Sequence, residues 1–223
     1  AKAKALKEEG ISAYVHTGSY GFPSLTLTDS VKKDIAFIDE IIGVKIALSD
    51  HRSPSITNDE LARLASDARV AGMLSGKAGI VVAHMGNGDK GLGPINKVLE
   101  DTEIPIRTFR PTHVNRKEEL LKEAFEYAKK GGIIDLTCGS NKDLSPANVV
   151  KMAEREGVPL ENITISSDGY GSWSRYDEYG NLVKIGVSSV DSLFNELKTM
   201  VLEVGYDLDK ALQFFTTNVS KAL

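Results

Sequence analysis

Cysteine is nearly absent from this chain of 223 residues, which holds only Cys138. A single cysteine cannot form a disulfide within the chain, so a disulfide framework is excluded and a reducing compartment is expected. No apolar run approaches the roughly 20 residues that a membrane-spanning helix needs. The opening AKAKALKEEG also lacks the apolar segment of a signal peptide. We therefore expect a cytoplasmic location and no membrane partner.

Basic residues are not in excess either. Lys and Arg number 27 against 31 Asp and Glu, which gives a net charge of −4. Binding to nucleic acid depends on clustered cations that neutralise phosphates, so we expect no nucleic-acid partner. The charge balance still allows a local cationic pocket for a small acid.

Proline-rich linkers and low-complexity segments are lacking too, and one supersecondary pattern recurs instead. Apolar runs of β type, each followed by a polar loop, occupy residues 11–16, 44–48, 79–84, 106–113, 133–137 and 163–168. Helical patterns are predicted over residues 29–42, 57–72, 92–100, 117–130, 145–156, 189–204 and 207–218. Six β-α units in series predict a parallel sheet with helices outside it.

Two architectures fit such a series, a doubly wound open sheet and a (β/α)₈ barrel. The barrel is favoured because reactive side chains occur in or at the ends of successive runs: Lys45, His84, His113 and Asp168. Barrel enzymes gather such residues from the C-terminal ends of different strands into one pocket. A complete barrel has eight units in about 250 residues, so two strands are unaccounted for.

These four residues suit a metal site. Lys45 lies inside the apolar run GVKIALSD, where a charged amine is costly unless it is paired, reaches solvent or is neutralised as a carbamate that bridges two cations. His84 or His113 alone would be read as a hydrogen-bonded structural residue. Together at successive strand ends, with Asp168 two strands later, they favour metal binding.

Other polar residues point to an acidic substrate. Arg52 and Arg116 follow two of these strands, and arginine pairs with carboxylates, although either could be ordinary surface charge. Asp168 could carry a proton between water and a leaving amine, or simply form an Asx-turn. Tyr20 could donate to a developing oxyanion, and Ser172 could bind a substrate carboxylate. The sequence predicts structural roles for His16 and His51, and a buried, unreactive Cys138.

The motifs around these residues resemble one family. HTGSYGFPS, GVKIALSDHRS, HMGNG, RPTHVNR and SSDGYGSWSRYDEYGNLVKIGV are similar to isoaspartyl (β-aspartyl) dipeptidases of the amidohydrolase superfamily, and the likeness covers essentially the whole chain. The resemblance implies an α/β fold, a (β/α)₈ TIM barrel of amidohydrolase type. About six β-α units, strands three to eight, would be present in this chain.

The resemblance also implies roles. Lys45 would be carbamylated by CO₂ and bridge two divalent metal ions, for which zinc is expected; His84 and His113 would bind one ion. Asp168 would bind the other and act as general acid/base in metal-dependent hydrolysis by a metal-bridging hydroxide. Tyr20 would polarise the scissile carbonyl. The substrate's carboxylates would be held by the remaining set, Arg52, Arg116 and Ser172. The substrate would be a β-aspartyl dipeptide and the metallo-dipeptidase a homo-oligomer.

Two features of that family are missing. The chain contains no His-x-His pair, which the family places at the end of its first barrel strand, and no small β-rich domain can be found. Residues 1–223 are therefore expected to form a partial barrel without its first two strands and without that domain. Two alternatives stay open: another dinuclear amidohydrolase of hydantoinase or dihydroorotase type, and an inactive barrel fragment.

Overall fold

The fold is built on six parallel strands that lie side by side in chain order. A computed structural model describes residues 1–53, 56–139 and 142–223. The strands are β1 (Val15–Gly18), β2 (Ile41–Leu48), β3 (Ile80–Met85), β4 (Phe109–Thr112), β5 (Ile134–Thr137) and β6 (Ile163–Ser166). Every neighbouring pair is parallel. This order, with a crossover between consecutive strands, is that of a (β/α) barrel, so the six predicted β-α units are confirmed.

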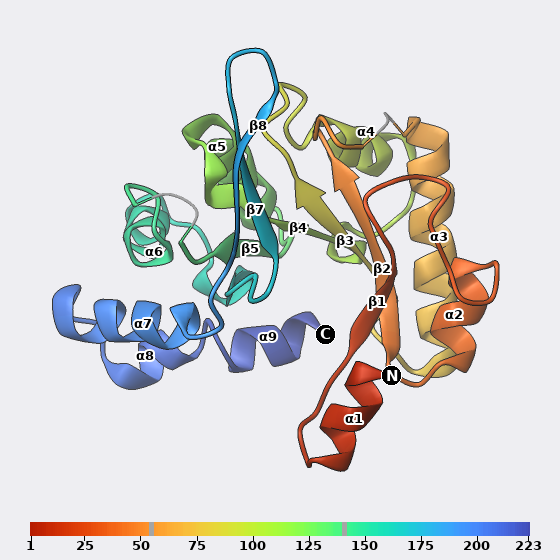
Figure 1. Ribbon diagram of the computed structural model, residues 1–223, viewed down its shortest axis with the longest axis horizontal. Helices are drawn as coiled ribbons and strands as arrows, with labels where there is room; N and C mark the ends of the chain where they lie inside the picture. The colour runs from red at the N-terminus through yellow and green to blue at the C-terminus, as the bar shows by residue number, and fades with distance from the viewer. Residues whose placement is uncertain (54–55, 140–141) are drawn as a thin grey trace.

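Helices cover the outside of the sheet (Figure 1). They are α2 (Val31–Phe37), α3 (Asn58–Ser75), α4 (Gly93–Asp101), α5 (Glu118–Lys129) and α6 (Pro146–Arg155). The core lies between strands and helices and includes Ile35, Ile46, Leu61, Phe109 and Phe125, all essentially inaccessible to solvent. Burying side chains of this size contributes about 1.5–3 kcal/mol each, so this layer holds the strand ends in place.

Helix starts follow the sequence signals closely. The Thr57 side chain accepts from the backbone of Glu60, and the Glu60 carboxylate accepts from the backbone of Thr57, so the two residues form a capping box at the start of α3. Ser30 caps α2 by accepting from the Lys33 amide. The predicted helix 29–42 was too long, however. It ends at Phe37, because the run that begins at Ile41 is buried on both faces as strand β2.

The C-terminal region is more broken than predicted. Helix α7 (Ser192–Lys198) continues into a π-helical turn (Thr199–Glu203), and α8 (Leu208–Leu212) and α9 (Thr217–Ala222) replace one continuous helix. The chain opens with α1 (Lys2–Glu8). Single 3₁₀ turns precede β4 and β6 and follow β4: Ile106–Thr108, Leu160–Asn162 and Val114–Arg116. None of the helices in the described ranges is both long and apolar enough to cross a membrane.

An antiparallel hairpin, not predicted from the sequence, follows the sixth strand. It pairs β7 (Ser172–Tyr176) with β8 (Leu182–Val187). The turn is organised by Asp177, whose carboxylate accepts from the amides of Tyr179 and Asn181. In Figure 1 the hairpin is the long teal-to-blue ribbon whose turn projects at the top of the view. Residues of β7 line the main polar cavity described below, so the hairpin forms one of its walls.

Candidate functional site

A cavity of about 590 Å³ opens at the C-terminal ends of the strands. Its walls come from the segments after β2, β3, β4, β5 and β6 and from the β7–β8 hairpin. Six residues with predicted metal-binding, catalytic or substrate-binding roles line this cavity: Arg52, His84, His113, Arg116, Asp168 and Ser172. Segments far apart in the chain therefore place these six side chains around one space, which is where barrel enzymes carry their active sites.

The two histidines form the centre of this cluster. The ring centroids of His84 and His113 lie 4.5 Å apart with an interplanar angle of 66°. Burial lowers the pKa of His84 to about 3 and that of His113 to about 2, and the nearby charges of Arg116 and Lys45 act in the same direction. Both imidazoles are therefore neutral near pH 7 and have a lone pair that can be donated to a cation.

The nitrogens of the two rings have different partners. His113 Nδ1 lies 2.6 Å from the hydroxyl of Thr137. His84 Nε2 lies 3.3 Å from Asp50 Oδ2 and 3.0 Å from Arg52 Nη2. His84 Nδ1 is buried and has no hydrogen-bond partner among the described residues.

The contact with Arg52 indicates which His84 nitrogen carries the proton. A guanidinium can only donate, so His84 Nε2 accepts from Arg52 Nη2 at 3.0 Å. The proton of the neutral ring is then on Nδ1, a buried donor without an acceptor among the described residues, which costs about 1–3 kcal/mol. A divalent cation would remove this cost, because its binding displaces the proton and occupies the buried Nδ1. The residues present therefore fit a divalent cation.

Lys45 and Tyr20 are close to the histidines but not among the described residues that line the cavity. Lys45 lies on β2 in register with Val82 of β3, and its positive charge contributes to the lowered pKa of His84 and His113. The ring of Tyr20 lies edge-on to His84 with centroids 4.9 Å apart. The guanidinium carbon of Arg52 lies 5.0 Å from the Tyr20 ring centroid.

Asp168 follows β6 in a left-handed backbone conformation with φ of 50°. Partial burial raises the pKa of its carboxyl, while the charges of Lys45 and Arg116 oppose the rise. The Asp168 carbonyl accepts from the Gly171 amide. A Cβ atom at position 171 would lie 2.6 Å from Asp168 Oδ1, so the glycine is required by the close approach of this carboxylate.

The two predicted arginines differ in their partners. Arg52 donates from Nε to Asp50 Oδ1 at 2.9 Å and from Nη2 to Asp50 Oδ2 at 2.8 Å, a bidentate pair. The hydrogen bonds from Arg52 hold the pKa of Asp50 well below its usual range. Arg116 is half-buried and makes no side-chain ion pair within the described ranges. Its guanidinium is thus the cation of this cavity that a substrate carboxylate could pair with most readily.

Sequence reasoning missed two carboxylates. Asp50 lines the cavity and binds Arg52; the signal was an acid two residues before the arginine in SDHR. Asp135 lies on β5 and accepts from Thr112 at 2.7 Å, Thr164 at 2.8 Å and Ser166 at 2.6 Å. It therefore ties β4, β5 and β6 together just below the ends that carry His113 and Asp168. An acid inside the apolar run IIDLTC could have indicated it.

The remaining predictions concern residues expected to have no part in the chemistry, of which Cys138 and His51 also line the main cavity. Cys138 is buried as expected, and burial raises the pKa of its thiol to about 12. His51 is exposed, with its ring 4.9 Å from that of Tyr176 on the hairpin. Burial lowers the pKa of His16 to about 4.

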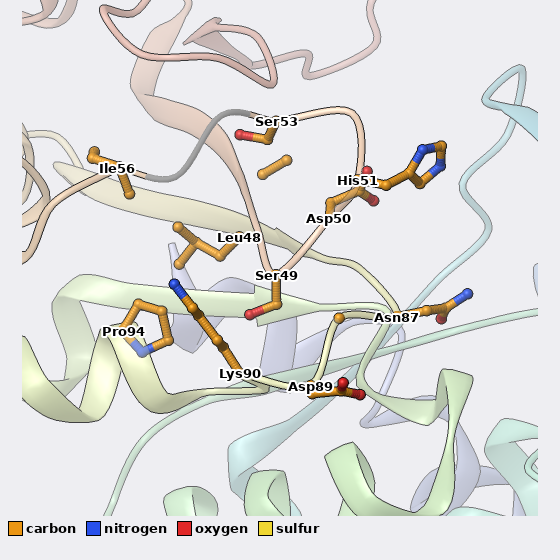
Figure 2. A pocket seen from close by; sticks show the side chains of 12 residues that line it. Leu48, Ser49, Asp50, His51, Ser53, Ile56, Asn87, Asp89, Lys90 and Pro94 are labelled. Carbon is orange, nitrogen blue, oxygen red and sulfur yellow. The ribbon is translucent and has the colours of Figure 1, made fainter. Parts of the chain in front are cut away.

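A second cavity adjoins the first between the loops that follow β2 and β3 (Figure 2). It also measures about 590 Å³ and shares Asp50, His51 and Asn87 with the main cavity. Figure 2 shows Ser49 and Asp50 on one wall and Asp89 with Lys90 on the other. Asp50 therefore lies between the two cavities and lines both of them.

The metal ligands proposed from the sequence are not assembled as one complete set. Within the described ranges, no group of three or more His, Cys, Asp and Glu side chains is arranged to hold a metal ion. The imidazoles of His84 and His113 lie together. That Lys45 bridges two ions as a carbamate, and that Asp168 is a metal ligand, stay predictions. The His-x-His pair that the family uses is absent from this sequence.

The parallel strand order and the cavity at the strand ends define a (β/α) barrel, of which this chain holds six units. Solved structures agree on the fold. A phosphotriesterase homology protein of Escherichia coli superposes with a TM-score of 0.65 at 17% identity, over 98% of this chain and 77% of that protein. An amidohydrolase of Mycoplasma synoviae superposes with a TM-score of 0.65 at 16% identity, over 99% of this chain and 69% of that protein.

A much closer likeness joins the chain to β-aspartyl dipeptidase of Fervidobacterium islandicum AW-1. The structure of that enzyme in complex with a β-Asp-Leu dipeptide matches with a TM-score of 0.94 and 42% identity over 99% of this chain. A second structure of that enzyme superposes with a TM-score of 0.87 at 40% identity. The resemblance to β-aspartyl dipeptidases indicated by the sequence is thus confirmed. This chain spans 59% and 57% of the length of those two structures. No family model matches the chain.

Proposed function

We propose that the protein hydrolyses β-aspartyl dipeptides. The observation that carries this proposal is the meeting in one cavity of two neutral imidazoles, a carboxylate and an arginine without an ion pair among the described residues. The chain is also 42% identical to an enzyme that was solved with β-Asp-Leu. The imidazoles suit a cation, and the arginine suits a carboxylate of the substrate. The finer assignments below extend the same proposal.

Four residues would hold two divalent cations, with zinc the expected metal: Lys45 as its carbamate, His84, His113 and Asp168. When bound, such ions supply a hydroxide nucleophile at neutral pH and polarise the carbonyl under attack. The support for this assignment is the unused, buried Nδ1 of His84 and the neutral state of both rings.

The protein's own side chains would then move protons and bind charge. The Asp168 carboxylate takes a proton from the attacking water and passes it to the departing amine, and its raised pKa brings it closer to the range where it can do both. The Tyr20 hydroxyl donates to the oxyanion that develops on the carbonyl. Arg52, Arg116 and Ser172 bind the carboxylates of the dipeptide.

A substrate panel tests the proposal against its rival. Zinc-loaded protein would be assayed with β-Asp-Leu, α-Asp-Leu, hydantoin and dihydroorotate. We expect cleavage of β-Asp-Leu alone; turnover of a cyclic amide instead would favour the hydantoinase-type alternative. Asp168→Asn should reduce kcat by about 10²–10⁴-fold with the zinc content little changed, because the substitution removes proton transfer, which typically contributes that factor. Near-native turnover would refute the role of Asp168.

The 223-residue chain and a full-length version should be compared in that panel, because an inactive 223-residue chain would support the barrel-fragment alternative for this sequence alone. The homo-oligomer and the cytoplasmic location expected from the sequence belong to the same proposal. Light scattering coupled to size-exclusion chromatography measures the first, and fractionation of cells measures the second.

A further inference from the structure

One face of the β7–β8 hairpin points into the main cavity. Ser172, Ser174 and Tyr176 alternate along β7, and all three line that cavity. Alternate residues of a strand share a face, so their side chains lie on the cavity side of the hairpin. Trp173 lies on the opposite face, because a Cβ atom at its cross-strand partner Gly186 would lie 2.2 Å from the indole. Of the two aromatic residues of β7, Tyr176 is therefore the one that faces the cavity.

Tyr176 is held at the rim of the cavity by neighbours from two segments. Its ring lies edge-on to that of His51, with centroids 4.9 Å apart and an interplanar angle of 81°. His51 belongs to the loop after β2, so this contact joins that loop to the hairpin. On the cavity face of the hairpin, Leu182 is the cross-strand partner of Tyr176. The phenol ring thus has a fixed position, yet 38% of the residue stays accessible.

The cavity changes in character from its floor to its rim. His84 and His113 are each only 4% exposed, and together with Arg116 and Asp168 they make the inner part of the cavity polar and charged. Tyr176 is far more accessible and adds apolar ring surface at the rim. A ligand whose charged end is bound at the floor would extend towards this rim with its other end. An aromatic ring gives a large apolar contact area and loses little side-chain entropy on binding, so it favours an apolar group there.

We infer that Tyr176, together with its neighbours Leu182 and His51, binds the side chain of the second amino acid of a β-aspartyl dipeptide and favours apolar side chains there. The inference rests on the proposed function, in which the floor of the cavity binds the aspartyl part and cleaves the amide. Each fully buried CH₂ group contributes about fourfold in affinity. Leucine has a longer side chain than glycine, and a wall on one side covers only part of it. β-Asp-Leu should therefore bind at least about tenfold more tightly than β-Asp-Gly.

A bracing role is the competing explanation. Tyr176 could serve only to hold His51 and the loop after β2, and a loosened loop would displace Arg52. Loss of Tyr176 would then weaken every dipeptide by the same factor, because the groups that bind the aspartyl part are common to all. A side-chain subsite instead changes the ratio between the leucine and glycine dipeptides. Tyr176→Phe keeps the ring and Tyr176→Ala removes it. Tyr179→Ala is the matched control, because Tyr179 is an exposed residue of the same hairpin and is not among the described residues that line the cavity.

Calorimetric titration with dipeptide analogues that cannot be cleaved measures this ratio. The probes are β-Asp-Leu and β-Asp-Gly with the scissile amide replaced by a CH₂–NH bond, added to the zinc-loaded protein. We expect the leucine analogue to bind at least about tenfold more tightly in the unmodified protein, Tyr176→Phe and Tyr179→Ala. In Tyr176→Ala the preference should fall below about threefold. The ratio of kcat/KM for the two dipeptides should change in the same way.

The outcomes separate this inference from the proposed function. A leucine preference below about threefold in the unmodified protein, in affinity or in kcat/KM, would overturn the inference even if both dipeptides are cleaved and no variant folds. A full preference that survives in folded Tyr176→Ala contradicts it as well. If both analogues bind with the expected ratio but neither dipeptide is cleaved, the proposed hydrolysis fails and the subsite stands. If neither analogue binds and neither dipeptide is cleaved, both proposals fail.

Discussion

The loop that carries Tyr20 is held in place by one buried acid, Asp34, in the first turn of α2. Its Oδ1 accepts from the Thr28 amide at 2.8 Å and from the Thr28 hydroxyl at 2.7 Å. Its Oδ2 accepts from the Leu27 amide at 2.9 Å and from the hydroxyl of Thr17 on β1. Asp34 is completely inaccessible to solvent, so no water can replace it as an acceptor.

Asp34→Asn should destabilise the protein strongly although the shape is unchanged. An amide has one oxygen and one NH₂ group, and each carboxylate oxygen of Asp34 faces a backbone N–H. Whichever way the amide is turned, its NH₂ group opposes either the Leu27 or the Thr28 amide. Losing the charge-assisted hydrogen bond costs about 1.5–3 kcal/mol, and leaving a buried donor unpaired costs about a further 1–3 kcal/mol. We therefore expect the free energy of unfolding to fall by about 3–4 kcal/mol at pH 7.

This loss should depend on pH in a defined direction. Burial alone would raise the pKa of Asp34, but the hydrogen bonds from Thr17, Leu27 and Thr28 outweigh it and lower the pKa below 3.8. A lowered folded-state pKa gives stability that is present above the unfolded value and disappears as the pH falls through the folded value. The difference in unfolding free energy between wild type and Asp34→Asn should therefore be constant from pH 7 to about pH 5 and decrease below pH 3.8.

Urea unfolding followed by circular dichroism measures this gap, with Asp39→Asn as the control. Asp39 is exposed and its change removes the same charge, so it should cost less than about 0.5 kcal/mol. A cost below 1 kcal/mol for Asp34→Asn, or a gap that is the same at pH 3 and pH 7, would refute the reasoning.

Two further predictions concern the cavity. Cys138 should react with iodoacetamide at pH 8 at least tenfold more slowly in the folded than in the unfolded protein, because burial raises its pKa to about 12 and the thiolate is the reactive form; equal rates would contradict this. Gly171→Ala should lower kcat at least about tenfold without unfolding the protein, since its Cβ would lie 2.6 Å from Asp168 Oδ1. Gly93→Ala, which meets no atom within 4 Å, is the control.

Much of the fold could be predicted because its signals are local. Apolar runs bounded by polar loops located all six strands, and the capping pair Thr57 and Glu60 located the start of α3. The predicted secondary structure was wrong where the local helical preference of a segment is outweighed by its pairing with distant strands. Residues 38–42 have a helical pattern, yet Ile41 and Ile42 are drawn into β2 because a buried position beside β1 and β3 is available to them. The hairpin was missed since its two strands lack the buried alternation that marks a strand.

The sequence by itself determined which chemical groups stand at the strand ends, because the order of strands and loops decides that His84, His113 and Asp168 all reach the same face of the barrel. Only the tertiary structure decided how they are used. His84 Nδ1, which has no partner among the described residues, and Arg52, which contacts both Asp50 and His84, depend on contacts between separate strand ends. Such contacts are set by the packing of whole helices and strands. The amino-acid pattern of one segment does not specify how the neighbouring segment is oriented.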